Sequence, residues 1–69
     1  MKISARNVLA GKITAIKKGP ISALVIIEVA PGVEITASIT ADAVKELKLK
    51  KGGPACAVIK ASSVLVGVE

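Results

Sequence analysis

The sequence lacks every aromatic residue type and lacks histidine. Without Phe, Trp or Tyr, the chain has no flat side chain on which nucleic-acid bases can stack, and each such stack contributes about 1–3 kcal/mol to single-strand binding. Without histidine, the commonest general base of enzymes is missing, and the five acidic residues stand singly along the chain. These absences argue against an enzyme. They also argue against a nucleic-acid-binding module, which stays open as the alternative because the chain is basic.

Cysteine and long apolar runs are also scarce. Cys56 is the only cysteine, so an internal disulfide is excluded and a reducing cytoplasmic setting is the simplest expectation. We predict that Cys56 is a small buried hydrophobe. The longest charge-free stretch, 19–27, is far shorter than the roughly 20 residues of a spanning helix, and no export signal is recognisable. We therefore expect a cytoplasmic protein with no membrane contact.

Apolar residues and positive charge are abundant. The 69 residues are 52% hydrophobic, with a mean hydropathy of +0.69, and they form one domain over 1–69. A chain of this size buries only about 60% of its unfolded surface, so the apolar surplus predicts a homo-oligomer. The net charge of +5 and the pI near 9.7 indicate an anionic partner.

Three strand-like segments precede a helix, at residues 7–17, 22–30 and 33–39. We expect a bend or bulge at Gly11 in the first of them. The segment 22–30 is apolar at nearly every position, which predicts cover on both faces and again an oligomer. The third alternates cleanly, so its inward side chains should be Val33, Ile35, Ala37 and Ile39.

Thr40 is typical of an N-cap, with Asp42 in the first turn of a short helix that should run to Leu47. Two further strands are predicted at 55–60 and 64–68. Three strands, a helix and two strands is the order of the five-stranded Greek-key barrel known as the OB-fold. The predicted fold class is therefore all-β, OB-fold-like, with one short helix between the third and fourth strands.

Hydrogen-bond donors without carboxylates gather where the predicted strands begin and end: Ser4, Arg6, Asn7, Thr40, Lys60, Ser62 and Ser63. Backbone N–H groups at the helix start would add more donors. Such a set suits an oxyanion that carries no proton, whereas phosphate at pH 7 keeps a proton and needs an acceptor. Two alternatives stay open. These residues can simply be the polar residues usual in turns at strand ends, with no binding role. Alternatively, Lys60 and Ser62 can form a nucleophile pair.

Three segments resemble the small molybdate-binding proteins called molbindins, or Mop domains: ISARNVLAGKITAIKKG, EITASITADAVKELKLKKG and AVIKASSVLVG. The resemblance implies an OB-like barrel assembled as a hexamer, a trimer of dimers, with oxyanions at subunit interfaces. It also implies storage or buffering of molybdate or tungstate. Molybdenum would then be present only as the oxyanion, with no direct protein ligand and no organic cofactor. No DNA-binding or transporter segment is recognisable, so we expect storage rather than regulation or transport.

Carried over by position, the resemblance implies an oxyanion site at Ser4, Ala5, Arg6 and Asn7 of one subunit and Lys60, Ala61 and Ser62 of another, joined by Thr40. Ala43 stands where some relatives have a second hydroxyl. A second type of site, near a symmetry axis, would use Gly19, Ile21 and Ser22. The intervening Pro20 has no N–H to offer it.

Overall fold

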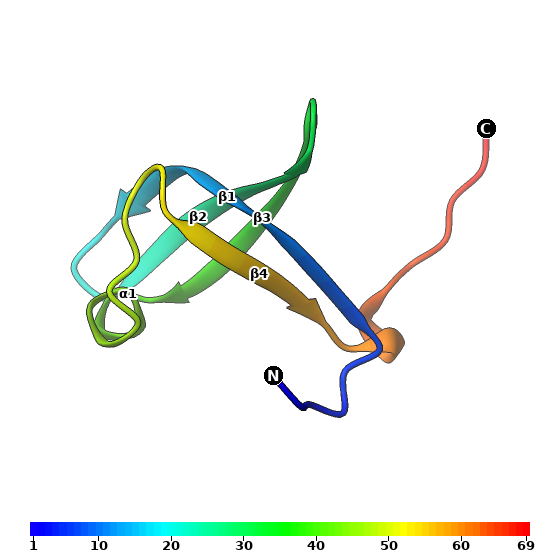
Figure 1. Cartoon of the computed structure of the whole chain (residues 1–69), viewed down its shortest axis with the longest axis horizontal. Coiled ribbons are helices and arrows are strands. Elements are labelled where there is room, and N and C mark those ends of the chain that lie inside the picture. The colour runs from blue at the N-terminus through cyan, green and yellow to red at the C-terminus, as the bar shows by residue number, and fades with distance from the viewer.

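Four antiparallel strands form one strongly curled sheet in a computed structural model that describes residues 1–69 (Figure 1). The elements in chain order are β1 (Asn7–Lys18), β2 (Ser22–Ala30), β3 (Val33–Thr40), the helix α1 (Ala41–Glu46), β4 (Pro54–Ile59) and the 3-10 turn η1 (Ala61–Ser63). The order across the sheet is β3-β2-β1-β4, so β3 and β4 are the two edges. The all-β class and the single short helix are thus confirmed, with four strands rather than five.

The inner face of the sheet carries the core. Ala23, Val25 and Ile27 alternate inward along β2 and pack with Ile13 of β1 and Ala57 of β4, while Val44 of α1 completes the cluster. No polar or charged residue is buried. The core therefore follows from period-two alternation, in which every second side chain of a strand points to the same face.

The outer face of the sheet stays uncovered within one chain. Leu24 of β2 is 41% exposed and Val58 of β4 also 41%, so the expectation that 22–30 is covered on both faces is not met by the single chain. Cys56 is exposed as well, and the prediction that it is buried was wrong. Its neighbour Ala57 points into the core, and alternation turns Cys56 outward.

The predicted N-cap is confirmed at Thr40. Its backbone is extended, with φ −75° and ψ 152°, and its Oγ1 accepts a hydrogen bond from the Ala43 N–H at 3.0 Å. The helix lasts only to Glu46, with Leu47 as its C-cap. The chain then returns to β1, where the Ile13 N–H donates to the Gly53 carbonyl at 2.9 Å and Ile13 accepts from the Gly52 N–H at 2.7 Å.

The irregularity in β1 lies at Thr14 and not at Gly11, because the β1–β2 register shifts between Ile13 and Ala15. Gly11 meets a different requirement. A Cβ at this position would overlap the backbone carbonyl of Glu28 and lie 2.9 Å from Cγ2 of Ile27. The two backbones approach so closely here that only glycine fits.

The predicted fifth strand at 64–68 is absent from the sheet of this chain. After η1 the chain extends away from the strands (Figure 1), and Leu65, Val66 and Val68 are 93%, 92% and 95% exposed. Strand structure requires a neighbouring strand for its backbone hydrogen bonds, and the segment reaches neither edge of the sheet. The preceding strand ends at Ile59, one residue earlier than expected. No helix is long and apolar enough to cross a membrane.

Candidate functional site: an open hollow beside the β1–β4 ladder

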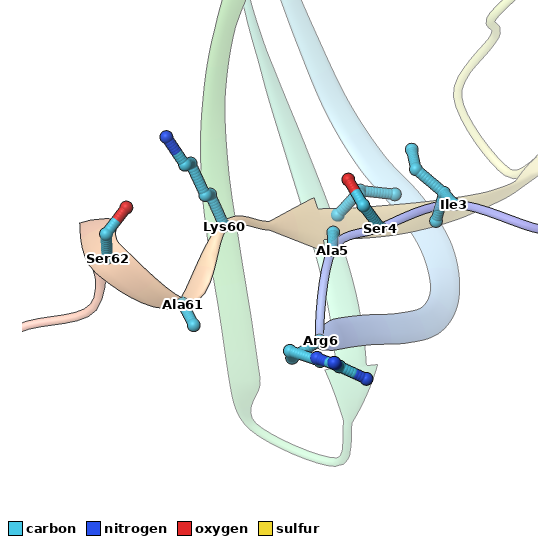
Figure 2. A pocket seen from close by; sticks show the side chains of 8 residues that line it. Ile3, Ser4, Ala5, Arg6, Lys60, Ala61 and Ser62 are labelled. Atoms are coloured by element: carbon cyan, nitrogen blue, oxygen red, sulfur yellow. The ribbon is translucent and has the colours of Figure 1, made fainter.

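Pairing of the first strand with the last brings the two ends of the chain together. Asn7 is in register with Ile59 and Val8 with Val58, so the residues just before β1 lie beside those just after β4. Between them is an open hollow of about 540 Å³ (Figure 2). Its lining consists of Ile3, Ser4, Ala5, Arg6, Val58, Lys60, Ala61 and Ser62.

Six of the eight residues predicted for the oxyanion site line this hollow: Ser4, Ala5, Arg6, Lys60, Ala61 and Ser62. The lining holds two cationic side chains, two hydroxyls and no carboxylate. The backbone turn of η1 is fixed locally, since the Ser63 N–H donates to the Lys60 carbonyl at 2.9 Å. Ser63, which belonged to the wider donor inventory, is not part of the lining.

Asn7 is adjacent to the hollow rather than in its lining. Its Nδ2 donates to the carbonyl of Ile59 at 3.3 Å, and the residue is partly buried. This side chain ties β1 to the end of β4 one residue before Lys60. In this chain the Asn7 amide therefore supports the pairing of β1 with β4.

The two cationic side chains do not converge within one chain. Lys60, Ser62 and Ser4 project to the same side of the ribbon in Figure 2, whereas Arg6 extends toward the opposite side. Both cations are exposed, and exposed long side chains re-orient readily. As the hollow stands, Lys60 and the two serines face one region of solvent and Arg6 faces another.

Thr40 lies away from the hollow. It ends β3 in register with Ser22, next to the β1–β2 turn and α1, at the other end of the sheet from η1 (Figure 1). The structure therefore does not bring Thr40 to Arg6 or Lys60 of the same chain. Two N–H groups at the helix start are already used within the chain. The Ala43 N–H donates to Oγ1 of Thr40, and the Ala41 N–H donates to the carbonyl of Ile21 at 2.8 Å.

The residues predicted for a second site, Gly19, Ile21 and Ser22, are grouped around this same turn. The Gly19 N–H donates to the Ser22 carbonyl at 2.8 Å, so it is committed to the turn. The Ile21 carbonyl is an acceptor and would repel an anion. The Ile21 N–H donates no backbone hydrogen bond, so this N–H and the Ser22 hydroxyl are left as donors.

Sequence reasoning missed Ile3 and Val58 as lining residues. Val58 could have been found, because the inward position of Ala57 turns both its neighbours outward on β4. Ile3 precedes the first strand, and no periodic pattern reaches it.

The chemistry of the hollow is that of an anion site. Ammonium, guanidinium and hydroxyl groups all donate hydrogen bonds, and bonds from the charged groups are roughly twice as strong as neutral ones. No group of three or more His, Cys, Asp or Glu residues is arranged to hold a metal ion directly. The fold and the hollow together define a small curled β-domain equipped to bind anions.

Comparison with known proteins assigns this domain to a family. The TOBE domain matches residues 3–66. The "Probable molybdenum-pterin-binding protein" of Haemophilus influenzae is 49% identical over 69 residues, covering all of both chains. The structure of MopII from Clostridium pasteurianum superposes with a TM-score of 0.90 at 43% identity, covering 97% of this chain and 100% of that one.

A third protein, the cytoplasmic molybdate-binding protein ModG with molybdate bound, gives a TM-score of 0.95 at 46% identity. The comparison covers 100% of this chain, which spans about half (49%) of ModG. The chain belongs to the TOBE domain family, and its resemblance to the molbindins, or Mop domains, is confirmed. The similar proteins are described as binding proteins rather than as enzymes.

Proposed function

We propose that this chain is a cytoplasmic, non-enzymatic binding protein for molybdate or tungstate that stores or buffers the oxyanion. The whole chain, 1–69, acts as one Mop domain in a homo-oligomer, a hexamer built as a trimer of dimers. The observation that carries the proposal is the carboxylate-free lining of the hollow, in which Arg6 and Lys60 supply the charge. The relationship to ModG, a cytoplasmic molybdate-binding protein, supports both the ligand and the compartment.

A dianion can leave water only if charge and donors replace its hydration. Transfer of an unpaired ion into a dry site is very unfavourable, and charge-assisted hydrogen bonds are the strongest compensation a protein offers. Arg6 and Lys60 provide two positive charges, and Ser4 and Ser62 provide hydroxyl donors. These groups balance the charge of one molybdate.

The site is shared between subunits in this proposal. Arg6 and Lys60 of one chain point in different directions (Figure 2), so one ion is best held by Arg6 of one subunit and Lys60 of another. Thr40 ends β3, at the other end of the sheet from η1 (Figure 1), so it reaches an ion only from a neighbouring subunit. The exposed outer sheet face supplies apolar surface for such contacts.

Selectivity follows from the absence of a carboxylate in the lining. Molybdate and tungstate carry no proton at neutral pH and have nearly the same size, so both are bound well. Sulfate also carries no proton but is smaller, and its oxygens would not reach all the donors. Phosphate retains a proton, which would find no carboxylate to accept it and would have to use a serine hydroxyl that is then lost as a donor to the anion.

Calorimetric titration of the purified protein tests the proposal, with molybdate, tungstate, sulfate, phosphate and a single-stranded oligonucleotide in parallel. We expect molybdate and tungstate to bind most tightly, sulfate weakly and phosphate weakest. Phosphate competing as well as tungstate would show that the site accepts the phosphate proton without penalty and would contradict the selectivity argument. Oligonucleotide binding without molybdate binding would replace the proposal with the nucleic-acid alternative.

A further inference from the structure

Positive charge is concentrated at the end of the sheet that carries α1. The β1–β2 turn, α1 and the loop after it lie together there (Figure 1), and the Ala41 N–H joins two of them by donating to the Ile21 carbonyl at 2.8 Å. The segments 17–22 and 41–53 hold six of the ten cationic residues and two of the five acidic ones, which is +4 of the net charge of +5. The six are Lys17, Lys18, Lys45, Lys48, Lys50 and Lys51. All are exposed, and none takes part in a side-chain hydrogen bond, so their charge is available to an anionic partner.

Residues 45–51, which are the end of α1 and the turn after it, are termed the lysine loop. Its backbone is fixed by two hydrogen bonds: the Lys48 N–H donates to the Lys45 carbonyl at 3.1 Å, and the Leu49 N–H donates to the Val44 carbonyl at 3.0 Å. This is the Schellman arrangement, which uses carbonyls that a helix leaves free at its end. Leu49 packs against the core, so Lys48 and Lys50 are held on either side of an anchored residue.

The backbone of Lys48 is in the left-handed region, with φ 54°, and it is the one residue other than glycine with a positive φ. Glycine adopts this conformation freely and is the usual residue at this position after a helix. A side chain with a Cβ is disfavoured there, and the Lys48 side chain gains no hydrogen bond within the chain in return. Strain kept at an exposed cationic residue points to a use for that side chain outside the chain.

An apolar side chain stands among these charges. Leu47 is the C-cap of α1 and is 66% exposed, and Lys48 follows it directly. An apolar centre with a polar rim is the anatomy of a protein interface, whereas binding of single-stranded nucleic acid relies on aromatic residues, which this chain lacks. A second copy of the chain carries the same lysines and the same net charge of +5, and like charges brought together at this surface would repel. The surface therefore fits an acidic polypeptide best.

We propose that the lysine loop is a docking surface for an acidic segment of another protein, in which one apolar side chain stands among several carboxylates. The apolar side chain packs on Leu47, and the carboxylates pair with Lys48, Lys50 and Lys51. The loop lies at the other end of the sheet from η1 and the hollow (Figure 1). Docking is thus a function beyond oxyanion binding, and neither one depends on the other.

Fluorescence anisotropy of the full chain with a labelled peptide, one leucine between two short runs of glutamate, tests the docking surface. The ionic strength should be about 0.1 M, where charges more than about 10 Å apart are largely screened. Replacing Lys48 and Lys50 together with Gln should weaken peptide binding by about three- to thirtyfold, since each exposed ion pair contributes modestly. The matched control replaces Lys2 and Lys12 with Gln, which removes the same charge from exposed positions outside the loop, and it should weaken binding less than about twofold.

Two further variants separate docking from folding and from charge alone. Lys48→Gly relieves the backbone strain, so it should raise the Tm and still weaken peptide binding, which excludes a folding defect as the cause. Leu47→Ser should weaken binding of the leucine peptide but not of a peptide with serine in place of leucine, because only the first has an apolar side chain to pack.

Three results would overturn the docking surface. The first is a parent chain that does not bind the peptide, and the second is equal weakening by the control pair, since long-range charge would then explain the binding. The third is tighter binding of a single-stranded oligonucleotide of the same net charge, weakened by the same loop variant, which would make the partner a nucleic acid. Molybdate titration of the variant lacking the Lys48 and Lys50 charges should match that of the parent, so the proposed function is decided separately.

Discussion

Replacing Arg6 or Lys60 with alanine removes one of the two cationic groups that line the hollow. A hydrogen bond to a charged group contributes about 1.5–3 kcal/mol, and every 1.4 kcal/mol changes affinity about tenfold. Each single substitution should therefore weaken molybdate binding by roughly ten- to a hundredfold. Neither side chain is buried, so the folded chain and its oligomer should survive both changes.

The assay is calorimetric titration of Arg6→Ala, Lys60→Ala and the double variant at one ionic strength. Lys12→Ala is the matched control, because it removes the same charge from an exposed position of β1 that is not part of the lining. The control should bind molybdate nearly as the parent does. If the two residues contact one ion, their effects should not add in the double variant.

Mixing the two single variants examines whether the ion is shared between chains. After subunit exchange, some interfaces pair an intact Arg6 with an intact Lys60 and should regain parental affinity. No recovery despite proven exchange would place both residues on one chain's own site. Equal weakening by Lys12→Ala would refute the reasoning altogether, since the effect would then be long-range charge rather than contact.

Two further predictions concern backbone positions identified by the fold. Gly11→Ala should lower the free energy of unfolding by about 1–3 kcal/mol and the Tm by roughly 5–20 °C, because its Cβ would meet the Glu28 backbone. The control Gly67→Ala, with nothing within 4 Å of its Cβ, should change thermal melting little. Equal melting of both variants would show that β1 and β2 can separate without cost. Thr40→Ala should lower the unfolding free energy by about 1 kcal/mol through loss of the N-cap and should also weaken molybdate binding. Thr40→Ser keeps the hydroxyl and should preserve both the stability and the affinity. A stability loss with unchanged affinity would remove Thr40 from the site.

The parts of the fold that depend on local signals could be predicted from the sequence. Alternation in β3 turns Ile35 and Ile39 toward the core as expected, the break between the segments 22–30 and 33–39 falls where the residue pattern puts it, and Thr40 caps α1 as its residue type indicates. Each of these is decided within a few residues of chain.

Features decided by partners distant in the sequence were harder to predict. The segment 64–68 has strand-like residues, but a strand also needs an edge to pair with, and residue patterns do not say whose edge that is. Cys56 was placed inside from its residue type, although the alternation around Ala57 turns it outward. Thr40 and Lys60 were grouped through the family resemblance, and the fold of one chain keeps them apart.

The order in which the chain folds follows from the β1–β4 ladder. Asn7 and Ile59 are 52 positions apart, and contacts of such separation form late because a long loop must close first. The segments that line the hollow, before β1 and after β4, are brought together only by this ladder, so a partly folded chain that lacks the paired β4 has no hollow. An ion that binds there stabilises the native state alone. If the hollow binds the oxyanion as proposed, binding therefore requires the closed β1–β4 ladder, and a chain in which this ladder has not formed should bind none.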